Sequence, residues 1–200
     1  IRNAWVSAYL GITYTILGKH ERAKALLEES LAIYKKDPLR NGIGVAWVLA
    51  HLGEIHNHQE DYKTAKSMLE EAITLYKAHF PEGHIKTGWA LSMLGEIYRT
   101  LKEYDKAKEA LKQSFAIYKK HLPDNQVVLA GLFVYLGAVH RDLGEYEKAK
   151  DFLEKSLDLY KKHVPEDHVE IAWALAHLGE TLGAMNNTQD AKALLEKSIK

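Results

Sequence analysis

Residues 91–118 read LSMLGEIYRTLKEYDKAKEALKQSFAIY, and this stretch indicates the fold. Apolar residues recur every three or four positions on both sides of a polar break at 101–104, which is the spacing of amphipathic helices. The stretch therefore predicts two helices joined by a tight turn. Such a hairpin has one apolar face, which it can bury only against a neighbouring hairpin.

Four further copies of this hairpin occur at a constant spacing. A leucine-glycine pair recurs every 42 residues, and an alanine follows each glycine by twelve. The glycines are Gly11, Gly53, Gly95, Gly137 and Gly179, and the alanines are Ala23, Ala65, Ala107, Ala149 and Ala191. A fixed period of this length predicts a stacked array. We expect the small residues to mark the closest approach of two helix axes.

The pattern predicts an all-α fold, a right-handed superhelical solenoid of antiparallel helix pairs. Five repeats and about ten helices form one domain over residues 1–200. The repeats span approximately 1–40, 41–82, 83–124, 125–166 and 167–200, and the last is truncated. We therefore expect the chain to be a segment of a longer array.

The breaks between copies carry proline, acidic and basic residues. Pro81, Pro123 and Pro165 are expected in the first turn of the next helix, where proline is tolerated. Glu82, Asp124 and Glu166 would then place acid at helix starts, and His79, His121 and His163 would place base at the preceding helix ends. The first junction departs from this pattern, with Pro38 one place early.

The combination of Leu94-Gly95, Tyr98, Ala107 and Leu111 resembles the tetratricopeptide repeat (TPR). The resemblance covers the whole chain, and the copies exceed the usual length of about 34 residues by one turn per helix. This longer variety is similar to the arrays of kinesin light chain, spindle-orientation adaptors and bacterial sensor proteins, which implies a role in holding other proteins. Gly131, where other copies have tryptophan, and Leu182, at the aromatic position, depart from the pattern.

The resemblance implies a peptide-binding concave surface lined by first helices. At about 100° per residue, Trp47 lies opposite His56, the residue at the aromatic core position, and so faces away from the partner helix. The candidate binding residues on this face of the five copies are Trp5, Tyr9, Trp47, His51, Glu54, His58, Trp89, Met93, Glu96, Arg99, Tyr135, Arg141, Trp173, His177 and Glu180. Such a surface suits a peptide that offers apolar and basic side chains.

These candidates have structural alternatives. The tryptophans could pack between neighbouring first helices, and the glutamates could pair within the chain. Tyr34, Tyr76, Tyr118 and Tyr160 lie among core leucines of second helices, and we interpret them as structural. The family's carboxylate clamp is absent, because its positions hold Ala8, Ile12, His51, Trp89 and Met93. The family's backbone-gripping asparagines are also absent, because the positions before the leucine-glycine pairs hold Tyr9, His51, Met93, Tyr135 and His177.

Composition and motifs argue against other classes of function. Lysine plus arginine equals aspartate plus glutamate at 27 each, so no net charge favours nucleic acid. No apolar run could cross a membrane, and the absence of cysteine agrees with a cytoplasmic location. His51, Glu54 and His58 share a helical face, but they match no metal-binding motif, and we expect no metal or cofactor. No catalytic constellation appears, so we expect no enzyme.

The sequence thus predicts a scaffold that binds a peptide or protein of unknown identity in the groove of first helices. Two alternatives remain open. The first is a self-association module that uses exposed array ends or the tryptophan groove. The second is a peptide-sensing regulatory segment of a larger protein. Both share the predicted fold and differ in the partner.

Overall fold

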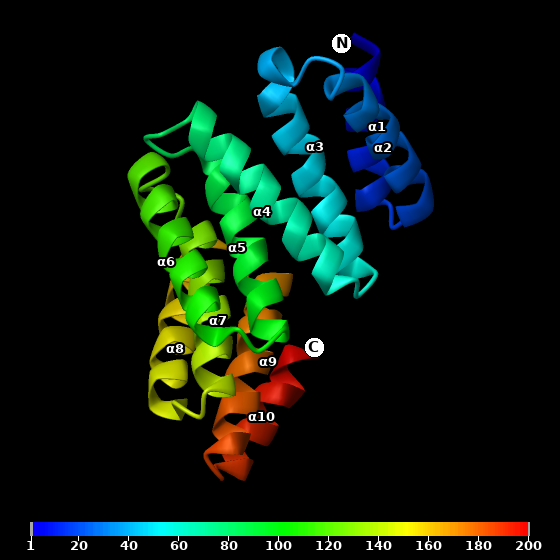
Figure 1. Ribbon diagram of the computed structural model, residues 1–200. Helices are drawn as coiled ribbons and strands as arrows, with labels where there is room; N and C mark the ends of the chain where they lie inside the picture. Colours follow the sequence, from blue (N-terminus) through cyan, green and yellow to red (C-terminus); the bar gives the residue numbers. More distant parts are fainter. Residues whose placement is uncertain (1, 200) are drawn as a thin grey trace. The chain divides into compact units, whose positions relative to one another are not determined.

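The computed structural model describes residues 2–199, which contain ten α-helices and no strand. The helices are α1 (Arg2–Ile16), α2 (His20–Tyr34), α3 (Pro38–His58), α4 (Tyr62–His79), α5 (Ile85–Thr100), α6 (Tyr104–His121), α7 (Gln126–Asp142), α8 (Tyr146–His163), α9 (Val169–Ala184) and α10 (Thr188–Ser198) (Figure 1). The predicted all-α class is confirmed. None of the helices within residues 2–199 has the length and apolar character that crossing a bilayer requires.

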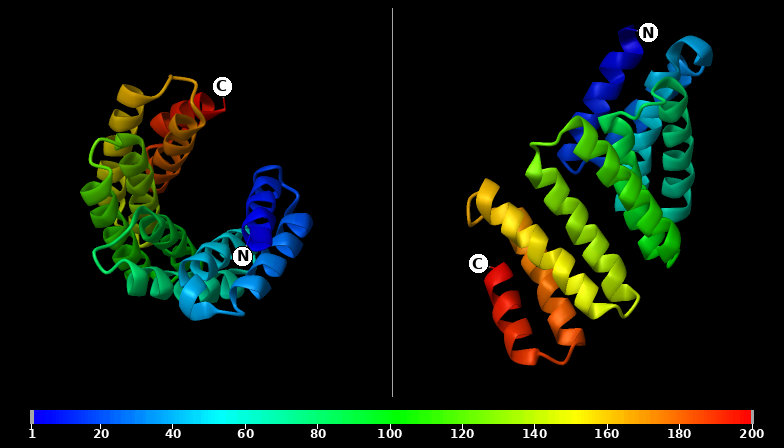
Figure 2. Two further views of the ribbon diagram at one scale, coloured as in Figure 1. Left: turned by 90° about the horizontal axis from the view of Figure 1, so that it is seen from above. Right: turned by 90° about the vertical axis from the view of Figure 1, so that its left-hand side faces the viewer.

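The chain divides into two compact units, residues 1–102 and residues 103–200. The first unit holds α1–α5 and the second holds α6–α10. Within each unit every helix packs against the next one in sequence, and first helices also contact each other in the pairs α1 and α3, α3 and α5, and α7 and α9. The views in Figures 1 and 2 show these neighbours side by side within each unit. Within each unit, successive helices are therefore stacked, as the repeat predicts.

The periodic glycines Gly11, Gly53, Gly137 and Gly179 lie at close contacts between paired helices, as predicted. A Cβ atom added to Gly53 would lie 2.9 Å from Cγ of Leu69, and one added to Gly137 would lie 2.7 Å from Cγ of Leu153. Each would also approach the carbonyl oxygen of the periodic alanine, at 3.3 Å for Ala65 and 3.2 Å for Ala149. Glycine is required here because any side chain would push the two helices apart.

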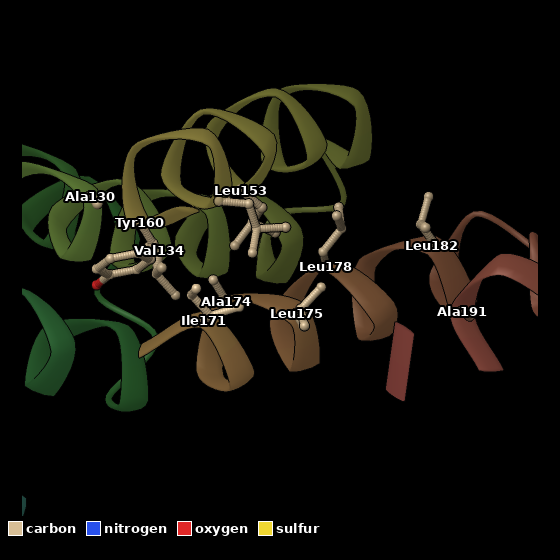
Figure 3. Close-up of a cluster of buried hydrophobic side chains, with 11 residues drawn as sticks. Ala130, Val134, Leu153, Tyr160, Ile171, Ala174, Leu175, Leu178, Leu182 and Ala191 are labelled. Atoms are coloured by element: carbon tan, nitrogen blue, oxygen red, sulfur yellow. The ribbon is translucent and has the colours of Figure 1, made fainter. Parts of the chain in front are cut away.

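The apolar residues of successive helices form the core of each unit. In the second unit, residues of α7, α8, α9 and α10 form one buried cluster (Figure 3). The tyrosines interpreted as structural, Tyr34, Tyr76, Tyr118 and Tyr160, are all buried, as predicted. Burial raises the pKa of Tyr118 to about 12 and that of Tyr76 further. Burial disfavours the phenolate, so these side chains serve packing.

The turns inside the copies share a left-handed residue that the sequence did not reveal. Gly18, Glu60, Lys102, Gly144 and Asn186 have φ angles between 60° and 77°, and they are 42 residues apart. Where the next residue's N–H is described, it bonds the carbonyl oxygen five residues back, as Glu145 does to His140 at 2.9 Å. This is the Schellman ending of a helix, which favours glycine at the left-handed position.

The prediction for the prolines between copies is wrong at three junctions. α4 ends at His79 and α5 begins at Ile85, so Pro81 and Glu82 lie in the intervening turn rather than in a helix. The same holds for Pro123 with Asp124 and for Pro165 with Glu166. The turn continues for two or three residues beyond each proline, and the helix starts after it. α3 alone begins at its proline, Pro38.

The basic residues at the ends of second helices are placed as predicted. α4, α6 and α8 end at His79, His121 and His163, with lysines in the same last turn. Their positive charge faces the negative end of the helix dipole. The starts of the following first helices lack the acid that we expected for α5 and α7. Asn125 instead caps α7, because its side chain accepts a hydrogen bond from the Val128 N–H at 3.3 Å.

Candidate functional site

The candidate residues lie on the first helices α1, α3, α5, α7 and α9, away from the packed faces of the pairs. We call those of residues 1–102 the first stripe and those of residues 103–200 the second stripe. The first stripe comprises Trp5, Tyr9, Trp47, His51, Glu54, His58, Trp89, Met93, Glu96 and Arg99. The second comprises Tyr135, Arg141, Trp173, His177 and Glu180. His56, which occupies the core position opposite Trp47 on α3, is buried, so the predicted helical phase of α3 is confirmed.

Five rings of the first stripe form a continuous chain across α1, α3 and α5. The ring centres of Trp5 and Tyr9 are 4.4 Å apart, and those of Tyr9 and Trp47 are 4.8 Å apart. The chain continues from Trp47 to His51 at 5.9 Å and from His51 to Trp89 at 4.8 Å. These are tilted or edge-on contacts, the arrangement that aromatic quadrupoles favour. Each step along a helix is thus followed by a step to the next first helix.

The rings of the first stripe both pack between helices and remain accessible. Trp5 is 54% exposed and Tyr9 is 48% exposed, whereas Trp47, His51 and Trp89 are half-buried. Packing between neighbouring first helices, the structural alternative for the tryptophans, is therefore part of their role, because Trp47 and Trp89 bridge such helices. Their remaining surface is available for contact, as an interaction site requires.

Lys86 belongs to this surface and was missed by sequence reasoning. Its Nζ lies 5.3 Å from the centre of the Trp47 ring, a cation–π contact within the chain. Burial lowers the pKa of Lys86, because a partly desolvated ammonium is disfavoured. The available signal was its spacing, since Lys86 precedes Trp89 by one helical turn and so shares its face. Lys86 of the chain itself thus makes the kind of contact with a tryptophan that we expected from a basic side chain of a partner.

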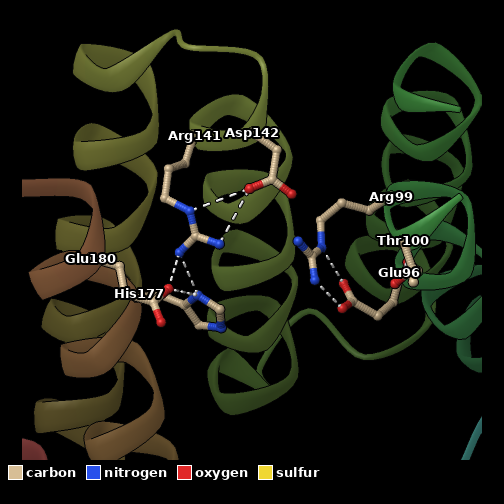
Figure 4. A network of polar contacts seen from close by, with 7 residues as sticks. All are labelled: Glu96, Arg99, Thr100, Arg141, Asp142, His177 and Glu180. Carbon is tan, nitrogen blue, oxygen red and sulfur yellow. Dashed lines mark hydrogen bonds and ion pairs between the residues drawn. The ribbon is translucent and has the colours of Figure 1, made fainter. Parts of the chain in front are cut away.

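The acidic residues of the first stripe are paired within the chain. Nδ1 of His51 lies 3.0 Å from Oε2 of Glu54. Arg99 donates two hydrogen bonds to Glu96, from Nε at 3.0 Å and from Nη2 at 2.6 Å (Figure 4). This is the intramolecular alternative considered from the sequence. A ligand that binds these carboxylates has to share or displace their present partners.

The second stripe contains a shorter ring chain and a polar network. The centres of the Tyr135 and Trp173 rings are 5.1 Å apart, and those of Trp173 and His177 are 5.5 Å apart. Arg141 donates to Nδ1 of His177 at 3.0 Å and contacts the Glu180 carboxylate (Figure 4). It also pairs with Asp142 at 3.3 Å. Arg141 of α7 therefore joins the two first helices of this unit.

Two positions interrupt the second stripe. Gly131 stands where the four other first helices have tryptophan, and Ala138, which replaces the glutamate of three other copies, is buried. A Cβ atom added to Gly131 would lie 3.2 Å from the hydroxyl oxygen of Tyr160, a tight contact, and would meet no other atom within 4 Å. The second stripe therefore has no counterpart to the indole that the other first helices carry at this position.

Other histidines and candidates lie apart from the ring chains. The exposed His58 stacks on His20 of α2, with ring centres 5.3 Å apart, and Met93 is half-buried on α5. His56 and His140 are hydrogen-bonded in their packed positions, as predicted, to Asp61 at 3.1 Å and to Glu145 at 2.6 Å. In the described part of the chain, no group of three or more histidine, aspartate or glutamate side chains could hold a metal ion.

Comparisons with known proteins agree with this architecture. The family model described as MalT-like TPR region matches residues 4–198. BtubC (BKLC) from P. vanneervenii is 15% identical, with a TM-score of 0.78 over 96% of this chain and 76% of that one. The nearly identical TPR-like repeats of a Podosopora anserina kinesin light chain candidate are 21% identical, with a TM-score of 0.75 over 96% of this chain and 92% of that one.

YrrB, whose structure is described as a TPR protein with an unusual peptide-binding site, is also similar. It is 19% identical, with a TM-score of 0.58 over 96% of this chain and 83% of that one. At these identities the solved structures show the fold alone. No curated protein matches the sequence.

Proposed function

Because the chain belongs to the MalT-like TPR family over residues 4–198, we propose that it is a scaffold that binds a peptide or protein segment along its first helices. TPR-like folds are typical of protein–protein interaction scaffolds, and the proposal extends this to a particular surface. It takes the five copies as one array, as their constant period predicts.

The observation that carries the proposal is the ring chain of the first stripe. Trp5, Tyr9, Trp47, His51 and Trp89 contact one another in series while keeping exposed surface. Rigid aromatic side chains lose little conformational entropy on binding, so they are frequent anchors of interfaces. The series crosses three helices, which suits an extended or helical segment rather than a compact small molecule.

The contacts that Lys86 and Arg99 make within the chain indicate which side chains we expect on the bound segment. Lys86 already contacts Trp47, and Arg99 already neutralises Glu96. A bound segment therefore gains most from apolar and aromatic contacts with the ring chain, and its basic groups compete with those of the chain itself. We therefore assign the glutamates of the first stripe a smaller contribution to partner binding than the sequence alone predicts.

Selection from a random peptide library displayed on phage tests the proposal. We expect enriched peptides that bind the wild-type protein and lose binding to the double variant Trp47→Ala, Trp89→Ala. Phe80→Ala, which removes a ring of the same unit that stacks on His84 at 4.6 Å outside the stripe, serves as the control. Enriched peptides that bind all three proteins equally would contradict the proposed surface.

A second candidate function, self-association, is favoured by one face of α1. Leu10 is 44% exposed, whereas its counterparts Leu52, Leu94, Leu136 and Leu178 are all buried. Val6 on the same helix is 52% exposed. An apolar face of this kind could pack against a second copy of the chain. Light scattering that shows a monomer at all concentrations would exclude this candidate.

A further inference from the structure

The second unit differs from the first at two positions whose counterparts contact each other in the first unit. In the first unit, Trp47 of α3 contacts the ammonium of Lys86, which lies in the first turn of α5. Two repeats later, the corresponding positions hold Gly131 of α7 and Glu170 of α9. The first unit thus supplies both an aromatic ring and a cation. The second supplies neither, and a carboxylate stands in place of the ammonium.

The Tyr160 hydroxyl connects these two positions. It is the atom nearest to a Cβ added at Gly131, at 3.2 Å. Burial raises the pKa of Tyr160, and electrostatic interactions with Glu170 and Tyr135 raise it further. We call the region around Gly131, Tyr135, Tyr160 and Glu170, where α7 lacks the indole of the other copies, the Gly131 gap. All four residues belong to the second unit, so the gap can be described within that unit.

The chemistry around the Gly131 gap suits a cation. The Glu170 carboxylate provides charge and the Tyr160 hydroxyl can accept a hydrogen bond. Tyr135 follows Gly131 by one turn of α7, and its ring, whose centre is 5.1 Å from that of Trp173, favours positive charge over its face. The Glu170 side chain is 35% exposed and contacts Nδ1 of His168, so an incoming cation shares this carboxylate with His168.

The position of Glu170 is not explained by its helix alone. An acid in the first turn of α9 interacts favourably with the helix dipole, which is a structural reason for its presence. The same position of α5 nevertheless holds a lysine, Lys86. The dipole therefore does not dictate the charge at this position. What changes together with the charge is the residue opposite, tryptophan in one unit and glycine in the other.

We propose that the Gly131 gap binds an arginine or lysine side chain of the partner, whose positive charge pairs with Glu170 as it lies against Tyr135. The inference rests on the proposed function, because it names a side chain that the bound segment would present. It assigns a basic residue of the partner to the second unit, whereas the ring chain of the first unit makes apolar contacts.

Titration with single blocked amino acids tests the proposal without a known partner. The probes are N-acetyl-arginine N-methylamide and its neutral isostere N-acetyl-citrulline N-methylamide. Binding is followed by NMR on the Gly131 amide and the Trp173 indole N–H at millimolar probe concentrations. We expect saturable shifts of both signals with the arginine probe, and an affinity for the citrulline probe that is lower by about tenfold, the effect of one charged pair.

Two variants locate the binding site. Glu170→Gln removes the charge with little change of shape, and Gly131→Trp fills the gap as in the other copies; both should abolish the shifts. The control Glu147→Gln removes a charge from the exposed first turn of α8 and should bind the arginine probe as wild type does. Thermal melts verify that each variant is folded, and Glu170→Gln carries the test if Gly131→Trp does not fold.

Three results with the arginine and citrulline probes would overturn the inference. They are no saturable shift at Gly131, equal binding of the arginine and citrulline probes, or unchanged arginine binding by Glu170→Gln. Stronger binding of N-acetyl-tryptophan N-methylamide would show that the gap takes a ring rather than a cation, and would also overturn it. The proposed function fails separately, when no displayed peptide depends on Trp47 and Trp89, so the two failures are distinguishable.

Discussion

The imidazole of His51 on α3 and the indole of Trp89 on α5 have ring centres 4.8 Å apart. Because His51 also contacts Trp47 and Glu54, it joins two first helices and orients one acid. We predict that His51→Ala lowers the free energy of unfolding by about 0.5–1.5 kcal/mol through loss of its ring contacts. His51→Phe should retain most of this stability, since it keeps a ring. Denaturant unfolding measures both, and equal losses in the two variants would contradict a packing role of the ring.

The glycine at a close helix contact should tolerate no side chain. Gly137→Leu would place its Cβ 2.7 Å from Cγ of the buried Leu153, so we expect a loss of about 1–3 kcal/mol in unfolding free energy. Gly183→Leu is the matched control, because a Cβ there meets only Ala191, at 3.9 Å. The control should be unchanged or more stable by up to about 1 kcal/mol. Similar stability of the two variants would refute the helix contact.

These contacts show which parts of the fold could be predicted from the sequence. The glycine, alanine and leucine positions follow from the 42-residue period, because each copy packs in the same way. The start of α5 at Ile85 was not predictable from Pro81, because a proline is equally compatible with a turn before the helix. The periodicity shows which face of a helix is buried, but not at which residue the helix begins.

The stripe residues were identified from helical phase, but their partners were not. Lys86 reaches Trp47 on another helix, and Arg141 reaches Glu180 in the same way. A long side chain can adopt several rotamers and reach partners on more than one neighbouring helix. The residue spacing along its own helix does not show which partner it contacts. The left-handed residue of each turn also recurs every 42 residues and so could have been predicted from the sequence. It was missed because only two of the five residues at this position are glycine.

The left-handed turn residues give a test that is free of packing effects. Gly144 has φ of 77°, and an added Cβ would meet nothing within 4 Å. Gly144→Ala should therefore lower stability by about 1 kcal/mol through backbone conformation alone. Glu60→Gly, at the equivalent turn with φ of 60°, should leave stability unchanged or raise it. Chemical denaturation compares them, and a neutral Gly144→Ala would contradict the turn conformation.

Acid should weaken the contact between His140 and Glu145. The hydrogen bonds that His140 and Lys148 donate hold the pKa of Glu145 below its usual 4.5. A carboxyl group with a lowered folded-state pKa stabilises the fold above its unfolded-state pKa, and this contribution is lost as the pH falls through the folded-state value. Glu145→Gln should therefore flatten the fall of Tm below about pH 4.5. An identical acid profile in the variant would argue against this contribution.

The central claim is that the ring chain of the first stripe binds a partner segment. Its most direct measurement is calorimetric titration of a selected peptide into the wild-type protein and into Trp47→Ala, Trp89→Ala, with thermal melts of both. We predict an affinity at least about tenfold lower in the double variant, which remains folded with a modestly reduced Tm. Unchanged affinity in a folded double variant would contradict the claim, and collapse of the fold would show that the two tryptophans serve mainly as core.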